Sequence, residues 1–278
     1  MRYTVILPVL NEIEGLKILL PRLSQLSCNV IVCDNGSSDG SLAYIKSFNH
    51  SISLSEGKGS VTDAIKRGIS LATTDNIIVM DSDGSHPIDY VGGIANLLEH
   101  HNMVIGSRYV DHGDNHDSES NVLISRGFNL LAYGLAPSVK DRASGFWGVR
   151  KSLLTNQIRD TKKPMLESLV RNRIKSVIEL PYTFIPRKAG KSKLGRSFKT
   201  ILSELWGLIL LYICKFQRPL KFLIVGGVGV GLNMGLLFLL TEKFNVWYMA
   251  SSAIGILVAT AWNYLINNYW TFGRKDLL

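Results

Sequence analysis

The sequence contains little cysteine and little charge. Among its 278 residues there are three cysteines, and charged side chains make up 19% of the chain. Because an odd number of cysteines without a Cys-X-X-Cys spacing does not suit a disulfide scaffold, we expect reduced thiols in a cytosol-facing protein. A disordered chain is also excluded, since a hydrophobic content of 46% offsets the entropy lost on ordering.

Charge is absent from two long stretches, Phe222–Leu240 and Phe244–Gly273. About 20 apolar residues cross a bilayer as a helix, so each stretch is long enough to span it. We therefore expect an integral membrane protein with two transmembrane helices, at about residues 219–241 and 246–268.

A glycine-rich run, Gly226–Gly231, lies inside the first uncharged stretch. No strand precedes it, so it is not a dinucleotide-binding fingerprint. Gly227, Gly231 and Gly235 recur every four residues, which predicts a face for close packing of membrane helices and a possible route to a homo-oligomer.

Positive charge is concentrated just before the first of these stretches. The net charge is +9, and between Arg187 and Lys221 nine Lys or Arg residues are set against one acid, Glu204, which gives this window +8. No aromatic platform accompanies the charge, which argues against nucleic acid as a partner. Because the run adjoins a membrane span, we expect membrane lipid and lipid phosphates to be its partners.

The first two-thirds of the chain alternate between apolar strands and helices. Strands are expected at residues 3–7, 29–33, 76–80 and 103–106, and helices at 12–26, 61–71 and 88–100. This alternation predicts an α/β fold with a mostly parallel sheet and helices on both faces. Ligands of such sheets bind beyond the carboxyl ends of the strands.

Asp81 and Asp83 follow the third predicted strand directly. Two carboxylates one residue apart at the end of a buried strand can bind a hard divalent cation through oxygen. Such a cation bridges a pyrophosphate and stabilises a leaving diphosphate. The alternative is a pair of solvated turn aspartates or a helix cap before Pro87.

Other strand ends carry polar residues with two interpretations. Asp34 and Asp39 bracket a Gly/Ser turn, which suits either a nucleoside-binding loop or a helix-capping turn. Asn11 and Glu12, after Pro8, suit either a ribose contact or a helix cap. Both alternatives stay open at this point.

Several cations are candidates for binding phosphate. Arg108 follows the fourth predicted strand, Arg126 opens an amphipathic stretch, and Arg187 begins a basic loop that contains Lys193. Arginine offers a bidentate fork that suits phosphate. Each alone is an ordinary surface charge, and only their convergence would make a phosphate clamp. Lys58 lies in a Gly-containing loop that lacks the spacing of a P-loop.

The segment Asp111–Glu119 is rich in His and Asp. Its potential metal ligands are irregularly spaced, so we interpret it as an exposed loop and not as a metal site.

Taken together, the motifs resemble those of family-two glycosyltransferases of GT-A fold, and among them the polyprenyl-phosphate glycosyltransferases, which include the dolichol-phosphate mannosyltransferases. The motifs that carry the resemblance are, in chain order, Pro8–Glu12, Asp34–Gly40, Asp81–Asp83, Val104–Tyr109, Ser125–Gly127, Asp141–Phe146 and Gly190–Leu194. Four positions depart from the family pattern: Asn35 stands where a second acid is usual, Gly84 and Ser85 replace Leu and Gln, and Trp147 replaces Arg.

The C-terminal part resembles a GtrA-like membrane domain through Asn263-Tyr264 and Asn267–Phe272. The family usually has four spans and this sequence has room for two, so the domain is shortened. An independent lipid-flipping role is therefore not expected.

The resemblance implies a metal-dependent, inverting transfer of a hexose from a nucleotide sugar to polyprenyl or dolichyl phosphate. GDP-mannose is favoured as donor over UDP-glucose, and Mg²⁺ or Mn²⁺ is the implied cofactor. The implied metal ligands are Asp81, Asp83 and Ser85. The implied nucleotide-binding residues are Pro8, Asn11, Glu12, Asp34, Asp39, Lys58 and Ser82. The implied catalytic residues are Asp81, Asp83, Arg108, Arg126 and Arg187. The implied ligands of the acceptor phosphate are these three arginines and Lys193. The alternatives are transfer of glucose or another sugar from a UDP-sugar, and a non-catalytic membrane adaptor that binds nucleotide sugar.

We expect three parts in the chain: a catalytic domain over residues 1–195, an interfacial amphipathic segment over 196–216, and a membrane domain over 217–278. The segment 198–216 is apolar but short for a span, so it is expected to lie on the membrane, with a core helix of the α/β domain as the alternative. Positive charges flank both predicted spans on one side, which places the catalytic domain on the cytoplasmic face.

Overall fold

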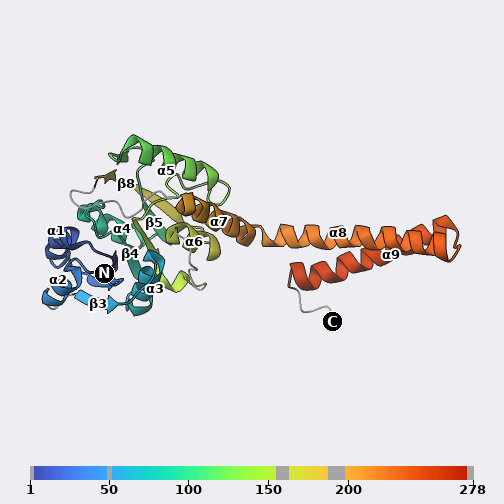
Figure 1. The fold of residues 1–278 in the computed structure, drawn as a ribbon, viewed down its shortest axis with the longest axis horizontal. Helices are drawn as coiled ribbons and strands as arrows, with labels where there is room; N and C mark the ends of the chain where they lie inside the picture. The colour runs from blue at the N-terminus through green and yellow to red at the C-terminus, as the bar shows by residue number, and fades with distance from the viewer. Residues whose placement is uncertain (1–2, 49–51, 155–162, 187–197, 274–278) are drawn as a thin grey trace. The chain divides into compact units, whose positions relative to one another are not determined.

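The computed structural model describes residues 3–48, 52–154, 163–186 and 198–273, and the side chains of 198–201 are not part of this description. Two compact units are present, Met1–Tyr212 and Ile213–Leu278. They are described separately below (Figure 1).

The first unit is built on a seven-stranded sheet with the order β3-β2-β1-β4-β7-β5-β8. The strands of this sheet are β1 (Thr4–Val9), β2 (Asn29–Asp34), β3 (Ile52–Glu56), β4 (Asn76–Val79), β5 (Met103–Ser107), β7 (Trp147–Arg150) and β8 (Val177–Pro181). All neighbours run parallel except β7, which is antiparallel to both β4 and β5. Two short strands, β6 (Asp114–Asn115) and β9 (Thr183–Phe184), pair with each other outside this sheet.

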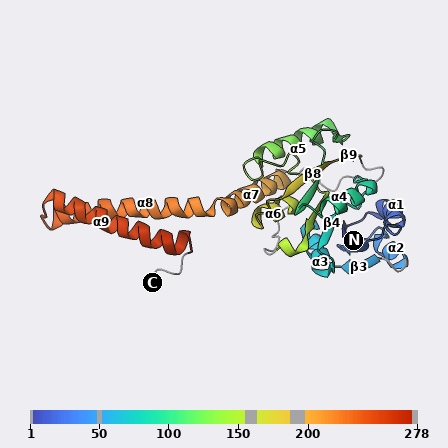
Figure 2. The same ribbon diagram turned by 180° about the vertical axis from the view of Figure 1, so that it is seen from behind.

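Helices cover both faces of the sheet (Figure 1, Figure 2). Their bounds are α1 (Ile13–Leu23), α2 (Ser41–Ser47), α3 (Val61–Leu71), η1 (Ile88–Tyr90), α4 (Val91–Leu97), α5 (Glu119–Leu131), η2 (Lys151–Leu153), α6 (Pro164–Arg171) and α7 (Phe198–Lys215). Apolar residues of α1, α2 and α4 pack on one side of the strands, and those of α3, α5, α6 and α7 pack on the other. Alternate strand residues point to opposite faces, so each strand contributes to both cores. The predicted fold class is confirmed.

The helix α7 is apolar on two opposite sides. Leu208 and Leu211 are buried in the core that α7 shares with α5 and α6. The Tyr212 hydroxyl donates to the Leu131 carbonyl at the end of α5, 2.8 Å away. The other side of the helix exposes large apolar residues: Leu202, Leu205, Trp206, Ile209, Leu210 and Ile213. The buried side of α7 fits the interpretation as a core helix, and the exposed apolar side fits the interpretation as an interfacial helix. The placement of α7 on a membrane stays a prediction.

The second unit is a hairpin of α8 (Gln217–Phe238) and α9 (Tyr248–Ile266), which are extended by the π-helical turns η3 (Leu239–Lys243) and η4 (Asn267–Thr271). Both helices, Gln217–Lys243 and Tyr248–Thr271 with their extensions, are long and apolar enough to cross a membrane.

Glycine allows α8 and α9 to approach closely, but not at the positions that the four-residue spacing predicted. A Cβ at Gly229 would lie 2.7 Å from the Asn263 amide oxygen, and one at Gly255 would lie 2.4 Å from that of Asn233. By contrast, a Cβ at Gly227, Gly231 or Gly235 would meet no atom of the described chain within 4 Å. The glycine face predicted from the sequence is therefore not the one that packs within this hairpin.

Candidate active site

Three polar loops meet at the carboxyl edge of the sheet because β2, β1 and β4 are neighbours. They follow β1 at Leu10–Glu12, β2 at Asn35–Gly40 and β4 at Met80–Pro87. This is the edge at which parallel sheets bind ligands.

The loops after β1 and β2 are joined by hydrogen bonds. The Asn11 backbone N–H donates to the Ser37 hydroxyl at 2.8 Å, and the Ser38 N–H donates to the Asn11 side-chain oxygen at 2.6 Å. The Glu12 N–H donates to the Ser41 hydroxyl at 2.9 Å. Asn11 has a φ of 52°, a left-handed conformation that asparagine tolerates better than most residues. Asn11 and Glu12 are thus held beside the turn that follows β2.

Asp34 and Asp39 both support this turn. The buried Asp34 carboxylate accepts hydrogen bonds from the N–H groups of Gly36 and Ser37, at 2.8 and 3.0 Å. Asp39 accepts from the N–H groups of Ile13 and Ser41, at 3.1 and 2.9 Å. Partial burial works to raise the pKa of Asp39, but hydrogen bonds from Ser41 and Ile13 hold it below the ordinary value. The turn-building interpretation is therefore realised for both residues, while their contact with a nucleotide stays a prediction.

Asn35 is turned into the protein. Its amide nitrogen donates to the Ser60 carbonyl at 2.9 Å, and its amide oxygen accepts from Arg67 at 2.7 Å. Arg67 also donates to the Asp34 carbonyl at 3.0 Å. An ionised aspartate at this position could not donate to Ser60. Asn35, which departs from the family pattern, therefore holds the loop before α3.

The Asp81–Asp83 loop is fastened to β1 and stabilised internally. The buried Ser82 hydroxyl donates to the Pro8 carbonyl at 2.8 Å. Ser85 donates to one oxygen of Asp83 through its backbone N–H at 2.9 Å and its hydroxyl at 2.6 Å. The side chain of Asp81 is 45% exposed. Pro8 and Ser82 are thus inside the protein and position the loop that carries the two carboxylates.

The oxygen donors in this loop fit a hard divalent cation. Asp81, Asp83 and Ser85 offer two carboxylates and a hydroxyl, which are the donor types that Mg²⁺ and Mn²⁺ prefer. Among the described residues no group of three or more His, Cys, Asp or Glu side chains is arranged for a metal, so further ligands would come from substrate oxygens. Mg²⁺ is commonly bound by one or two carboxylates together with substrate phosphates.

His86 supports Asp81 from behind. Its Nδ1 accepts a hydrogen bond from the Asp81 N–H at 2.9 Å, and its Nε2 lies 3.8 Å from an Asp81 carboxylate oxygen. The buried ring stacks on Phe146 with centroids 5.1 Å apart and meets the edge of Tyr182 at 5.8 Å. Burial lowers the pKa of His86 against the opposing effect of Asp81 and Asp83. Sequence reasoning did not assign this residue a role.

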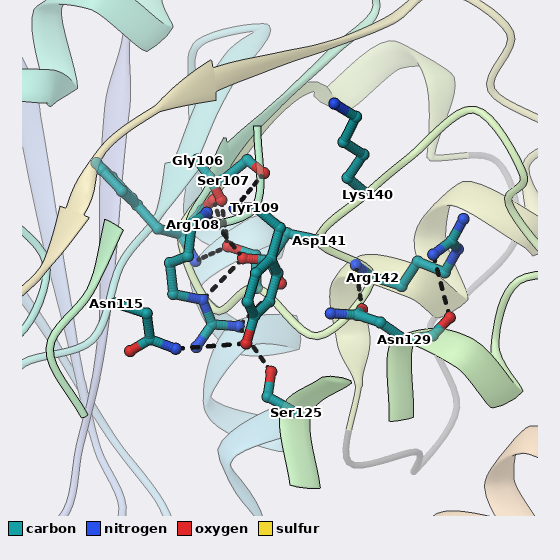
Figure 3. A network of polar contacts seen from close by, with 12 residues as sticks. Gly106, Ser107, Arg108, Tyr109, Asn115, Ser125, Asn129, Lys140, Asp141 and Arg142 are labelled. Carbon is teal, nitrogen blue, oxygen red and sulfur yellow. Dashed lines mark hydrogen bonds and ion pairs between the residues drawn. The ribbon is translucent and has the colours of Figure 1, made fainter. Parts of the chain in front are cut away.

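Arg108 is bound to a buried carboxylate (Figure 3). Its Nε and one terminal nitrogen donate to the two oxygens of Asp141 at 2.7 and 2.8 Å, and its backbone N–H donates to Asp141 at 3.1 Å. The same terminal nitrogen lies 3.4 Å from the Ser125 hydroxyl on α5. Burial alone would lower the pKa of Arg108, but Asp141 raises it above the ordinary value. The predicted phosphate ligand is therefore held rigidly and permanently charged.

The support of Arg108 extends through the loop around Asp141. The Asp141 N–H donates to Glu179 on β8 at 2.9 Å. Arg142 donates from its side chain to the carbonyls of Ala136 and Asn129, at 2.8 and 3.1 Å, which ties the loop to α5 (Figure 3). Sequence reasoning placed Asp141 and Arg142 in a motif but gave neither a role.

Of the remaining predicted residues, two are exposed and two are not among the residues that the structure describes. Arg126 is exposed on α5, and Lys58 is exposed in the loop between β3 and α3. Arg187 and Lys193 lie outside the described residues. In the His/Asp-rich segment, Asp114 pairs with His116 at 2.7 Å, and both side chains are more than half exposed.

Residues 4–156 match the family described as Glycosyl transferase family 2, and residues 221–277 match the GtrA/DPMS transmembrane domain. The first match covers more than half of the chain, so the chain belongs to glycosyltransferase family 2.

The chain is also similar to named relatives in sequence and to solved structures in fold. The chain is 28% identical to a dolichol-phosphate mannosyltransferase of Pyrococcus furiosus, over 100% of this chain and 82% of that protein. It is 29% identical to one of Saccharomyces cerevisiae, over 77% of this chain and 88% of that protein. Glucosyl-3-phosphoglycerate synthase of Mycobacterium tuberculosis, in complex with Mn²⁺ and UDP, has a similar fold, with a TM-score of 0.57 and 17% identity over 77% of this chain and 79% of that chain.

Proposed function

We propose that this protein transfers a hexose, with mannose favoured, from a nucleotide sugar to a membrane polyprenyl or dolichyl phosphate. The observation that carries the proposal is the Asp81–Asp83 loop at the carboxyl edge of a family-two domain, in a chain that also holds two helices able to span a membrane. The curated relatives named above, which are dolichol-phosphate mannosyltransferases, support this substrate pair.

Asp81, Asp83 and Ser85 would hold Mg²⁺ or Mn²⁺. When bound there, the cation supplies neutralisation of the charge that grows on the departing nucleoside diphosphate. The related solved structures contain Mn²⁺ or Mg²⁺ together with UDP, which supports a divalent cation. Ser85 donates to the Asp83 carboxylate and His86 accepts from the Asp81 N–H, so these two residues would hold the proposed metal ligands in place.

The joined loops after β1 and β2 would bind the nucleotide. Asp34 is the last residue of β2, and Asn11, Glu12, Asp39 and Lys58 lie on the loops that follow β1, β2 and β3. The carboxylates of Asp34 and Asp39 already accept hydrogen bonds from backbone N–H groups. We therefore propose that their main role is to maintain the shape of the nucleotide-binding surface.

The acceptor needs little activation. A phosphate monoester has a second pKa of about 6, so the acceptor is largely a dianion at neutral pH and is already nucleophilic. Arg108 would bind this phosphate and hold it in line with the anomeric carbon, with Arg126, Arg187 and Lys193 as further proposed ligands. A single direct displacement inverts the anomeric configuration and forms no covalent sugar–enzyme intermediate.

The membrane brings the acceptor to the protein. A polyprenyl tail leaves the bilayer only at a cost of about 0.8 kcal/mol for each CH₂ group exposed. The apolar outer side of α7, together with Leu123, Ile124, Leu130 and Leu131 exposed on the adjoining α5, suits contact with lipid. The positive flanks of the two spans favour a cytoplasmic catalytic unit.

The test is a transfer assay with the purified full-length chain in detergent. Polyprenyl phosphate, Mn²⁺ or Mg²⁺ and one radiolabelled nucleotide sugar are incubated, and label in the organic phase is counted with and without EDTA. We expect EDTA-sensitive labelling from GDP-mannose. Asp83→Ala should abolish transfer. Asp114→Ala, which removes an exposed carboxylate outside the Asp81–Asp83 loop, should have little effect.

The same assay separates the alternatives. Labelling from UDP-glucose in place of GDP-mannose would show that the donor differs from the one proposed and that the type of reaction is the same. Binding of nucleotide sugar without labelling of lipid from any donor would favour a non-catalytic adaptor. Full activity of Asp83→Ala would overturn the metal assignment.

A further inference from the structure

Lys163 lies where three elements of the catalytic unit meet. It is the residue before α6, and Pro164 then starts the helix. Its amine is 4.6 Å from the centre of the Phe128 ring on α5 and 3.9 Å from the Glu204 carboxylate on α7. The amine is therefore placed between the two helices whose outer sides are apolar and exposed.

The same amine is linked to the candidate active site through α5. Arg108 lies 3.4 Å from the Ser125 hydroxyl on α5, and Phe128, about one helical turn further along, contacts the Lys163 amine. Burial lowers the pKa of the Lys163 amine, and Glu204 opposes that effect. Lys163 is thus a cation where α5, α6 and α7 meet, and α5 also carries the Ser125 hydroxyl that Arg108 contacts.

The donors of Lys163 are poorly used by the described part of the chain. A lysine amine has three N–H donors. The 3.9 Å separation from Glu204 is too long for a hydrogen bond, and the side chain is 26% exposed. The contact with Phe128 stabilises the positive charge and accepts no conventional hydrogen bond. The amine therefore has N–H donors left for an anion.

We propose that Lys163 binds the phosphate of the acceptor lipid, beside Arg108. This inference rests on the function proposed above, and it adds a binding residue that neither the motifs nor the family resemblance indicated. The two cations differ in a useful way. Arg108 is held rigidly by Asp141, whereas the lysine amine, on a flexible stem, can follow the phosphate as the lipid arrives.

A purely structural role makes a different prediction. If Lys163 only fastened α6 to α7 through Glu204, removal of either partner would have the same effect. If Lys163 binds phosphate, removal of Glu204 would leave the amine in place and free it for the ligand.

The experiment measures equilibrium binding of a radiolabelled polyprenyl phosphate to the full-length protein in detergent, with unphosphorylated polyprenol as the comparison ligand. The variants are Lys163→Met, Lys163→Arg and Glu204→Gln. Lys140→Met is the matched control, because Lys140 is exposed and its side chain points away from Arg108 (Figure 3). Transfer kinetics are recorded for the same samples.

We expect Lys163→Met to weaken binding of polyprenyl phosphate by about tenfold or more, the usual effect of losing a charged hydrogen bond. Binding of polyprenol and the KM for the nucleotide sugar should not change. Lys163→Arg should restore most of the affinity, and Glu204→Gln and Lys140→Met should keep it. An equal loss in Lys163→Met and Glu204→Gln, or no loss in Lys163→Met, would overturn the proposal. Wild-type protein that binds the lipid phosphate but transfers no sugar would contradict the proposed function and leave the Lys163 assignment standing.

Discussion

The imidazole of His86 accepts a hydrogen bond from the backbone N–H of Asp81 at Nδ1, 2.9 Å away, and therefore presents Nε2 toward the carboxylate of the same residue. With Nδ1 acting as acceptor, the neutral ring carries its proton on Nε2. One aromatic side chain thus holds the backbone of a proposed metal ligand, and its Nε2 lies 3.8 Å from the carboxylate of that ligand. Phe146 and Tyr182 hold the ring in this orientation.

This relationship predicts that His86→Ala weakens binding of Mn²⁺ by about 10- to 100-fold, the usual effect of losing a residue that orients a metal ligand. Electron paramagnetic resonance of free Mn²⁺, titrated with purified protein and a nucleoside diphosphate, measures this directly. The control is His116→Ala, which removes an exposed imidazole. Unchanged Mn²⁺ affinity in a folded His86→Ala protein would contradict the assignment.

A glycine in α1 allows the Asp81–Asp83 loop to approach the helix. A Cβ at Gly15 would lie 2.1 Å from the Ser82 carbonyl oxygen and 2.9 Å from the Asp83 Cα, both backbone atoms. Gly15→Ala should therefore displace the loop, reduce transfer and lower the free energy of unfolding by about 1–3 kcal/mol.

The control for Gly15 is Gly92→Ala in α4, where a Cβ would meet no described atom within 4 Å. Alanine there should be neutral or stabilise by up to about 1 kcal/mol. Thermal unfolding and transfer rate are measured for both variants. A Gly15→Ala protein as stable and active as Gly92→Ala would show that the loop is not restrained by α1.

The pair formed by Arg108 and Asp141 is nearly buried, with side chains 12% and 0% exposed. Asp141→Asn should destabilise the catalytic unit by about 3–5 kcal/mol, because it leaves a buried guanidinium without its counter-charge. Asp89→Asn interrupts the exposed pair with Arg22, at 2.8 Å, and should cost at most about 1 kcal/mol. Chemical unfolding of the two variants gives the comparison, and similar small losses would mean that the buried pair is not needed for stability.

The close approach of α8 and α9 at Gly229 gives a prediction for the membrane hairpin. Gly229→Leu should separate the helices, since even a Cβ there would come within 2.7 Å of Asn263, whereas Gly231→Leu should be tolerated. Helix content in increasing concentrations of SDS measures the resistance of each variant to unfolding. A strong loss for Gly231→Leu would instead indicate that the Gly227–Gly231–Gly235 face is occupied by another helix, as in a homo-oligomer.

Most of the regular structure was predictable from local patterns. The helix at 61–71 has the predicted bounds, and the four predicted strands all form, as β1, β2, β4 and β5. The sequence pattern gave no bounds for α2 and did not reveal β3, because both are short and only partly apolar. Nor did it show that β7 runs antiparallel, since a four-residue strand carries no sign of its direction.

The chain's own sequence was sufficient to determine the fold class, the two stretches long and apolar enough to span a membrane, and the position of Asp81 and Asp83 at a strand end, because each follows from residues close together in the chain. Only the tertiary structure decided which charges meet. Arg108 and Asp141 are 33 residues apart, and Lys163, just before α6, meets Glu204 of α7. Such pairs form only when helices and strands pack together. The burial of the charged groups, which sets their pKa values and the energy of the interaction between them, exists only in the folded protein.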